Sequence, residues 1–461
     1  MASSKLHIAM FPWLAYGHII PFLNLANNLA RRGHKISFLL PKKPHLKLSS
    51  NSNNNNNLIT FHLLSVPNVE GLPAGAETTS DTDNLQALSS AMDAMQEQVK
   101  AVLEAERPDI VVFDFADWMP ALAREFGCKT VFFSVISSVI ASVLVVTFSS
   151  KGRPLTAADF MESVPNFTYS SKPVLSEREA YNRSVFVNQP NNKVLEFLRK
   201  SVLGAKGSDA IAVRACAEME GSHCEHLEKQ YGKPVLCTGP LLEEEEEAPL
   251  LEAKIANWLD KFDDTSVVYC AFGSESVLEI SQFQELILGL ELSGLPFLLA
   301  STKPPKGTSS IQEAMPEGFQ ERVKEKALLH GGWVPQTLIL KHKKIGCFVS
   351  HGGSASMWES LVSDCQIVVA PIRQDYYMNA RLMAEELGVA VQVEKGENGG
   401  WLSKENLSTA IKSAMDMDGE RKVGVLVKEN HNKWRDVLLS PGFADTYIHK
   451  FIQNLDELLG H

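Results

Sequence analysis

Four polar side chains follow apolar, strand-like segments of this sequence, and they are of types that move protons or bind anions and hydroxyls. His18 follows the first such segment, Asp114 follows DIVVF, His351 follows IGCFVS, and Asp375 lies in the loop after QIVVAPI. In open parallel α/β sheets, ligands bind at the carboxyl ends of the strands. We therefore expect these four side chains to mark a functional site.

His18 and Asp114 together are typical of a general base with an orienting carboxylate. The carboxylate would fix the imidazole tautomer and stabilise the imidazolium that forms when the histidine takes a proton from a hydroxyl. A structural interpretation is equally open, with His18 at a helix N-terminus and Asp114 as the cap of a helix at Asp117–Trp118. Asp117 is an alternative partner of His18.

Small residues follow His351 in the run GGSAS of residues 352–356, and helical spacing begins there. Such residues let a backbone approach a ligand closely, and a helix N-terminus presents unpaired N–H groups at the positive end of its dipole. This is a candidate phosphate site. Ser356 and Glu359 also match the capping box S-x-x-E, which is the simpler explanation. The functional alternative is that Ser356 and the glycines hold a diphosphate while Glu359 binds a ribose diol.

Apolar runs that alternate with helical spacing predict two parallel α/β sheets covered on both faces. The chain of 461 residues is too long for one ordinary core, so two domains are expected. The break is predicted at Gly239-Pro240, before a solvated run of glutamates, which gives domains at 1–240 and 253–440 and a linker at 241–252. The predicted strands are 5–11, 34–40, 59–65, 109–113, 130–134, 209–214, 234–238, 266–272, 295–300, 345–350, 366–372 and 389–393.

Four other segments carry specific expectations. Residues 84–106 have the spacing of one amphipathic helix. Residues 152–192 are predicted to be irregular surface segments around a pocket. The polar run 49–57 is expected to be a loop. Residues 131–150 carry no charge and are long enough to span a bilayer, but their six serines favour a buried strand followed by a pocket-lining helix.

Composition and missing motifs argue against several classes of protein. A net charge of −11 disfavours a nucleic-acid binder. Seven dispersed cysteines without CxxC, and an N-terminus without a signal-peptide pattern, indicate a cytoplasmic protein with reduced thiols. The first strand is not followed by G-x-G-x-x-G, and Walker, G-x-S-x-G and metal-ligand spacings are missing, which disfavours a dinucleotide dehydrogenase, a nucleotide hydrolase or an esterase.

The stretch from Trp333 to Tyr376 resembles, over its whole length, the signature box of plant family 1 UDP-glycosyltransferases. The resemblance extends to Gly17-His18 with Pro21-Phe22, and to the turn Phe272-Gly273-Ser274. The segments SDAIA, MWESL and SDCQIV resemble one branch of that family, whose members add a second sugar to a flavonoid or related glycoside.

The resemblance implies a GT-B fold of two Rossmann-like domains, an acceptor domain and a UDP-sugar domain, with a C-terminal helix (441–461) that crosses back to the first. It implies that His18, with Asp114, deprotonates an acceptor hydroxyl that attacks the anomeric carbon with inversion. Trp333, which from sequence alone is either a core aromatic or a stacking platform, would stack on uracil. Val334 and Gln336 would lie near the uracil, and Glu359 would bind the ribose. The residues implied around the diphosphate are Ser274, His351, Gly353, Ser354, Ala355 and Ser356. Asp375 and Tyr376 would contact the sugar. We expect no metal and no cofactor besides the co-substrate, because the helix N-terminus and His351 would offset the charge on the departing UDP. A monomer is expected.

The chain departs from the family pattern at four positions. Gly352, Ser354 and Ala355 replace the usual Cys, Trp and Asn, and Tyr376 replaces the Gln of glucose donors or the His often found with galactose or pentose donors. A tyrosine offers one hydroxyl and an apolar ring in place of a bidentate amide. The favoured donor is therefore UDP-rhamnose, whose 6-methyl group could meet that ring, ahead of UDP-glucose and UDP-xylose. A UDP-sugar-binding protein that has lost turnover is the non-enzyme alternative.

Overall fold

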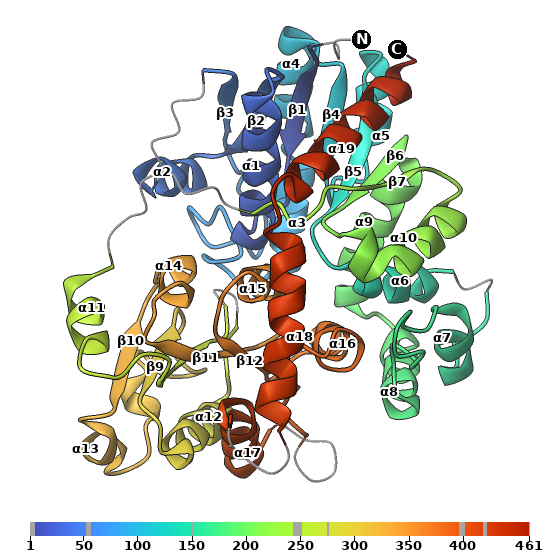
Figure 1. The fold of residues 1–461 in the computed structure, drawn as a ribbon. Coiled ribbons are helices and arrows are strands. Elements are labelled where there is room, and N and C mark those ends of the chain that lie inside the picture. The colour runs from blue at the N-terminus through green and yellow to red at the C-terminus, as the bar shows by residue number, and fades with distance from the viewer. Residues whose placement is uncertain are drawn as a thin grey trace. The chain divides into compact units, whose positions relative to one another are not determined.

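The computed structural model describes residues 5–51, 57–149, 152–242, 251–273, 276–395, 402–417 and 422–460 (Figure 1). The chain forms two compact units. The first contains residues 1–166, 173–243 and 441–461, and the second contains residues 167–172 and 244–440. The predicted position Ser274 and most of the predicted linker lie outside the described residues.

The first unit is built on a parallel sheet with the strand order β3-β2-β1-β4-β5-β6-β7. The apolar runs predicted as strands form this sheet: β1 (His7–Phe11), β2 (Lys35–Pro41), β3 (Ile59–Leu64), β4 (Ile110–Phe113), β5 (Lys129–Ser134), β6 (Ala210–Val213) and β7 (Val235–Cys237). The order reverses direction between β1 and β4, which places the topological switch point of the sheet there.

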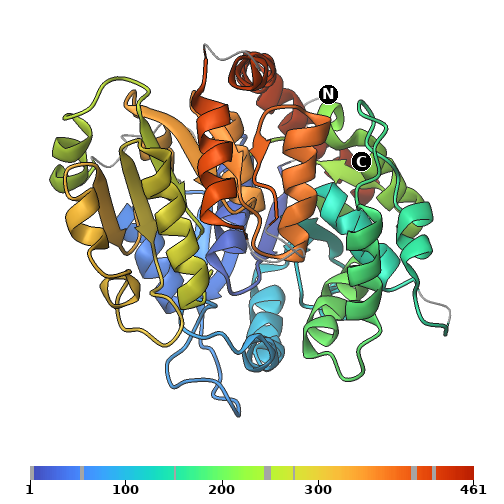
Figure 2. The same ribbon diagram turned by 90° about the horizontal axis from the view of Figure 1, so that it is seen from below.

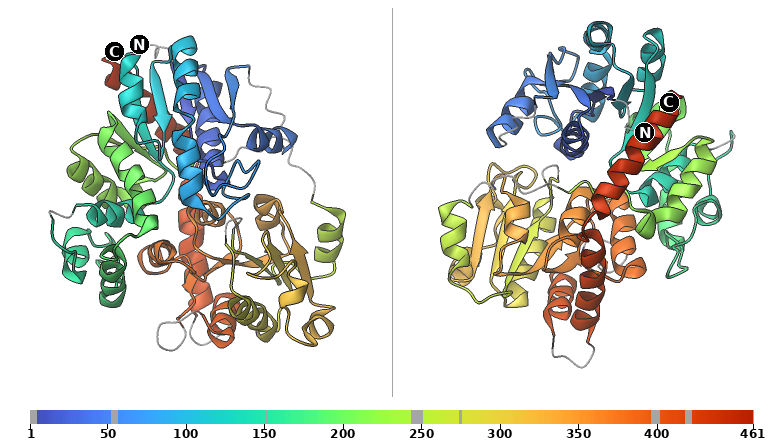
Figure 3. Two further views of the ribbon diagram at one scale, coloured as in Figure 1. Left: turned by 180° about the vertical axis from the view of Figure 1, so that it is seen from behind. Right: turned by 45° about the horizontal axis from the view of Figure 1, so that its top comes forward.

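The helices that accompany this sheet are α1 (Tyr16–Arg31), α2 (Lys42–Asn51), α3 (Leu85–Asp93), α4 (Gln96–Glu106), α5 (Met119–Glu125), α6 (Ser138–Thr147), α7 (Ala157–Ser163), α8 (Glu177–Val187), α9 (Lys193–Gly207), α10 (Ala217–Tyr231) and α19 (Phe443–Leu459). Helix α19, red in Figure 3, belongs to this unit, and its buried Ile448, Phe451, Ile452 and Leu455 join the core formed by α1 and the central strands.

Three sequence predictions for this unit are wrong. Residues 84–106 form two helices, because the chain turns at Ala94–Met95 between α3 and α4. Residues 152–192 contain α7 and α8, each of which begins with a reciprocal capping box. The polar run 49–57 is not all loop, since α2 extends to Asn51; residues 52–56 of that run lie outside the described residues.

Residues 131–149 contain the end of β5 followed by α6, so the prediction of a buried strand and helix is confirmed. Every described residue of α6 except Ala141 is buried. In the described part of the chain, no helix combines the length and the apolar character needed to cross a bilayer.

The second unit is built on a parallel sheet with the order β10-β9-β8-β11-β12-β13, whose strands appear in yellow to orange in Figure 2. Its strands are β8 (Val267–Ala271), β9 (Phe297–Ser301), β10 (Ala327–Gly331), β11 (Ile345–Ser350), β12 (Gln366–Val369) and β13 (Val391–Gln392). Strand β10 was not predicted, because its short run ALLHG follows a charged segment. Here the order reverses between β8 and β11.

The helices of the second unit are α11 (Ala253–Leu259), α12 (Ile280–Ser293), α13 (Phe319–Val323), α14 (Gln336–Leu340), α15 (Ser354–Leu361), α16 (Gln374–Arg381), α17 (Lys404–Met415) and α18 (Val423–Leu438). A π-helical turn, Leu382–Glu386, follows α16 directly. The Glu386 carboxylate at its end accepts hydrogen bonds from the backbone N–H groups of Tyr169 and Ser170, each at 2.8 Å, in the segment 167–172.

Candidate active site

The switch point of the first sheet explains why His18 and Asp114 meet although 96 positions separate them. Strands β1 and β4 are neighbours, with Phe11 in register with Phe113. Asp114 follows β4 directly, and His18 lies in the first turn of α1, which begins after the short loop that follows β1. Both side chains therefore lie beyond the carboxyl ends of adjacent strands.

The structure pairs His18 with Asp114. His18 Nδ1 lies 2.5 Å from Asp114 Oδ2, and the backbone N–H of Trp13 donates to Asp114 Oδ1. The carboxyl side chain is 2% exposed and the imidazole 20% exposed. Burial raises the pKa of the Asp114 carboxyl, and the charge and hydrogen bond of His18 and the N–H of Trp13 oppose that shift. Because an ionised carboxylate only accepts, Nδ1 carries the proton and Nε2 presents its lone pair.

Of the alternatives for these residues, only the position of His18 at a helix N-terminus is confirmed, in the first turn of α1. Helix α5 begins at Met119 with Trp118 at its N-cap position and without a capping side chain, so Asp114 is not its cap. Asp117 is not the partner of His18. Burial raises the pKa of Asp117 as well, and the charges that act on it are those of Lys200 and Asp93.

A cluster of three aromatic rings contacts the imidazole through one of its members. Phe115 has a left-handed backbone with φ of 50°, and its ring meets the His18 ring edge-on at 5.6 Å between centroids. The Phe115 ring stacks on Phe197 at 4.5 Å, and Trp13 contacts both rings. A phenylalanine with positive φ is strained, and such strain concentrates at functional sites. The sequence reasoning did not assign roles to Trp13 and Phe197.

In the second unit, the segment after β11 has the geometry of a candidate anion-binding site. Gly352 has φ of 85°, Gly353 is the N-cap of α15, and Ser354, Ala355 and Ser356 are the first three helical residues. Backbone N–H groups at these positions have no acceptor within the helix. The capping-box interpretation of Ser356 and Glu359 is wrong, because Ser356 lies inside the helix and not at its N-cap.

His351 fills the space between two glycines. A Cβ atom added at Gly273 would lie 2.9 Å from His351 Cε1, and one added at Gly353 would lie 2.4 Å from His351 Nε2. Burial lowers the pKa of His351 to about 4. At neutral pH the imidazole of the ligand-free protein is therefore uncharged. His351 was expected to offset the charge of UDP, but a neutral imidazole can contribute only a hydrogen bond.

Three further residues of the predicted donor site lie just before α14 or at its start. Trp333 is 50% exposed, so it is not a core aromatic, while Val334 is buried. Gln336 begins α14, and its Nε2 donates to Glu359 Oε2 at 2.5 Å and to Ser356 Oγ at 3.2 Å. The structure thus brings Gln336, Ser356 and Glu359 into one hydrogen-bonded group.

Asp375 and Tyr376 lie in the first turn of α16. The Asp375 carboxylate is 3.8 Å from Arg373 Nε, and its side chain is 40% exposed. The Tyr376 ring meets His351 edge-on at 4.8 Å between centroids, and the Arg373 guanidinium lies over the same ring at 5.5 Å. Tyr376 is therefore in contact with the group that borders the anion-binding segment.

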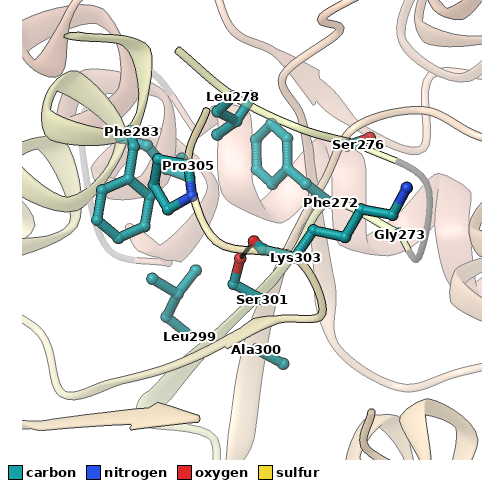
Figure 4. Close-up of a pocket in the computed structure, with 11 residues that line it drawn as sticks. Phe272, Gly273, Ser276, Leu278, Phe283, Leu299, Ala300, Ser301, Lys303 and Pro305 are labelled. Atoms are coloured by element: carbon teal, nitrogen blue, oxygen red, sulfur yellow. Dashed lines mark hydrogen bonds between the residues drawn. The ribbon is translucent and has the colours of Figure 1, made fainter. Parts of the chain in front are cut away.

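A pocket beyond the ends of β8 and β9 borders the Gly273 turn (Figure 4). Thr302 Oγ1 donates to the Gly273 carbonyl at 3.1 Å, which connects the two loops. Lys303 extends along the pocket toward that turn in Figure 4, a cation that the sequence reasoning did not single out. The residues that line the pocket are Phe272, Gly273, Ser276, Leu278, Phe283, Leu286, Leu299, Ala300, Ser301, Lys303 and Pro305. Among the described residues no cluster of three or more His, Cys, Asp or Glu could hold a metal ion.

Two Rossmann-like units, each with polar side chains at the switch point of its sheet, define a GT-B fold, as predicted. The crystal structure of UGT89C1 from Arabidopsis thaliana, complexed with UDP-L-rhamnose, matches with a TM-score of 0.74 and 21% identity, over 98% of this chain and 100% of that one. The family model for UDP-glucoronosyl and UDP-glucosyl transferase matches residues 312–428.

Two relatives from Arabidopsis thaliana match over nearly the full length of both chains. UDP-glycosyltransferase 79B6 is 47% identical over 99% of this chain and 98% of its own length. Anthocyanidin 3-O-glucoside 2'''-O-xylosyltransferase is 46% identical, also over 99% of this chain and 98% of its own length. The chain belongs to the plant family 1 UDP-glycosyltransferases and is a UDP-glycosyltransferase enzyme, which confirms the family predicted from the signature box.

Proposed function

We propose that this enzyme transfers a sugar from a UDP-sugar, with inversion, to a sugar hydroxyl of a plant secondary-metabolite glycoside. The acceptor class rests on the resemblance to the glycoside-modifying branch and on the 46% identity to a relative named as acting on an anthocyanidin 3-O-glucoside. The single observation that carries the chemistry is the His18–Asp114 pair, which leaves Nε2 as a proton acceptor.

In this proposal His18 removes the proton of the acceptor hydroxyl as the oxygen attacks the anomeric carbon and UDP departs. Asp114 holds the tautomer and stabilises the imidazolium. The Phe115 ring, which stacks on Phe197, packs against the ring of the base. A His18→Ala variant is expected to lose nearly all transfer while it still binds UDP; a variant that keeps most of its rate would refute this assignment.

In this proposal the UDP part of the donor binds to residues of α14, α15 and the loops before them. Trp333, half exposed, stacks on uracil with the Val334 backbone and Gln336 beside it, and Glu359 binds the ribose. The diphosphate lies at Gly353 and the N–H groups of Ser354, Ala355 and Ser356, near His351 and Ser274. The helix dipole and these donors offset the charge that develops on the departing UDP, so we propose a reaction without a metal.

The donor in this proposal is a UDP-sugar without a 6-hydroxyl group, UDP-rhamnose first. Asp375 binds sugar hydroxyls, and the Tyr376 ring replaces the amide that would bind further hydroxyls. UDP-xylose is the second candidate, because the 46% identical relative is named a xylosyltransferase and xylose has no C6. We also propose a cytoplasmic, monomeric enzyme, consistent with its seven free cysteines.

Turnover with each purified donor on a panel of flavonoid and anthocyanidin 3-O-glucosides tests the donor proposal. We expect UDP-rhamnose to give the highest kcat/KM, and Tyr376→Gln to shift preference toward UDP-glucose. Tyr376→Phe is the matched control, since it keeps the ring against His351 and should keep the preference for a sugar without a 6-hydroxyl. A clear preference of the wild-type enzyme for UDP-glucose would overturn the proposal.

A further inference from the structure

The amide of Gln336 lies at the centre of a hydrogen-bonded group in the second unit. Its Nε2 faces the Glu359 carboxylate and the Ser356 hydroxyl, and its Oε1 lies 3.2 Å from the Tyr269 hydroxyl. With Gln336 itself, four side chains from β8, α14 and α15 therefore form this group. Sequence reasoning gave roles to three of them and none to Tyr269.

The chemistry of these groups fixes the direction of each hydrogen bond. A carboxylate only accepts, so the NH2 end of the Gln336 amide must face Glu359. The carbonyl end then faces Tyr269, and an amide oxygen also only accepts, so the Tyr269 hydroxyl must donate to it. Burial raises the pKa of Tyr269 well above its ordinary value, with the charge of Glu359 acting in the same direction. The hydroxyl therefore stays protonated, and remains a donor, at neutral pH.

The Tyr269 side chain is more buried and more closely packed than the Gln336 side chain that it contacts. Its side chain is fully buried on β8, and its ring stacks on Phe348 of the neighbouring strand β11 at 5.2 Å with an interplanar angle of 13°. Gln336 is only partly buried, at the first position of a five-residue helix. A glutamine side chain that no contact restrains loses much rotamer entropy when a ligand orders it. A contact that orders it before the ligand arrives lowers the cost of binding.

We propose that Tyr269 is a positioning residue for the donor nucleotide: its hydroxyl sets the orientation of Gln336 and, through it, the place of the Glu359 carboxylate. This inference rests on the proposed function, in which Gln336 and Glu359 bind the nucleoside part of UDP. Tyr269 acts on donor affinity and not on proton transfer, because it touches neither half of the His18–Asp114 pair.

Tyr269→Phe tests the inference, since it keeps the ring and its stacking on Phe348 and removes one donor. A neutral hydrogen bond contributes about 0.5–1.5 kcal/mol, which corresponds to a loss of about two- to twelvefold in affinity. We expect the Kd of UDP, measured by calorimetry, and the KM of the UDP-sugar to rise by this factor while kcat stays within about twofold. The retained kcat also shows that the variant is folded.

Two further variants separate positioning from a structural effect. Tyr231→Phe removes the same atom from α10 of the first unit and should leave the Kd of UDP unchanged. In a Gln336→Ala background, Tyr269→Phe should cost no further affinity, because it acts through the missing amide. An unchanged Kd in Tyr269→Phe, or losses that multiply in the double variant, would overturn the inference while the proposed function stands. Wild-type protein that fails to bind UDP would instead overturn the proposed function.

Discussion

Replacing Asp114 by asparagine changes the direction of one hydrogen bond with almost no change in shape. In Asp114→Asn the amide oxygen of the new side chain can still accept the backbone N–H of Trp13, which leaves its NH2 group facing His18 Nδ1. A donor in that place requires Nδ1 to be the acceptor, so the imidazole proton moves to Nε2. The nitrogen that faces the acceptor hydroxyl in the proposed mechanism then carries a proton and cannot take another.

The expected fall in kcat follows from the loss of general-base catalysis by His18. A positioned general base contributes about 10²–10⁴ to the rate, and the same substitution in the serine-protease triad, with the same tautomer change, costs about 10⁴. We therefore expect kcat to fall by about 10²–10⁴, which is about 2.7–5.5 kcal/mol of transition-state stabilisation. The Kd of UDP should not change, because the residues proposed to bind it belong to the second unit.

The assay is steady-state transfer at saturating UDP-sugar and glycoside, with UDP binding measured on the same preparations. Asp117→Asn is the matched control: it makes the same chemical change three residues further on, at a carboxyl whose charged neighbours are Lys200 and Asp93. It should keep the rate within about twofold. An Asp114→Asn enzyme with more than a tenth of the wild-type kcat, or an Asp117→Asn enzyme that is equally impaired, would refute the assignment of the pair.

Two further predictions concern the anion-binding segment and the stability of the fold. Gly353→Ala should weaken UDP binding at least tenfold by calorimetry, because its Cβ would lie 2.4 Å from His351 Nε2 and displace the imidazole. Gly331→Ala, with open space around its Cβ, is the control. An unchanged Kd of UDP in Gly353→Ala would contradict the proposal that the segment after β11 binds the diphosphate. The buried His223, His351 and His431 each have a pKa lowered to about 4 from 6.5, so the unfolded chain takes up protons between pH 6.5 and 4 that the folded chain does not. The free energy of unfolding should therefore fall as the pH falls through this window, by roughly 3 kcal/mol for each histidine, and urea titrations at several pH values that show no such fall would refute it.

Most strands and the types of the site residues could be predicted from the sequence, but residue spacing alone could not decide which of those residues pair. Apolar runs identify β1 and β4 well. Their adjacency depends on the strand order, which local patterns do not contain, and the pairing of His18 with Asp114 depends on that adjacency. From spacing alone, Asp114 is equally acceptable as the cap of a helix and as the partner of His18. The burial of its carboxyl and the register of the two strands decide between them.

The two missed helices show where hydrophobic periodicity fails. Helix α7 buries only Phe160, and α8 buries only Ala180 and Ser184, so neither has an apolar stripe for a pattern search to find. Their N-terminal signals were present, however. Thr156 with Asp159 and Ser176 with Glu179 are reciprocal capping boxes in the structure, and both pairs are legible in the sequence. For helices that cover little core, the cap is the more informative signal.

Gly352 and Tyr376, two of the departures from the signature box, lie in close contact. Gly352 has φ of 85°, and a Cβ there would lie 3.1 Å from the Tyr376 carbonyl oxygen, 3.1 Å from Val369 Cγ1 and 3.5 Å from Tyr376 Cβ. Asn379 of α16 holds the same loop by donating to the Gly352 carbonyl at 2.8 Å. A residue with a side chain at position 352 would be strained in this conformation and would push the first turn of α16 away. Glycine at 352 therefore accommodates the close approach of this loop to the first turn of α16, in which the Tyr376 ring lies against His351.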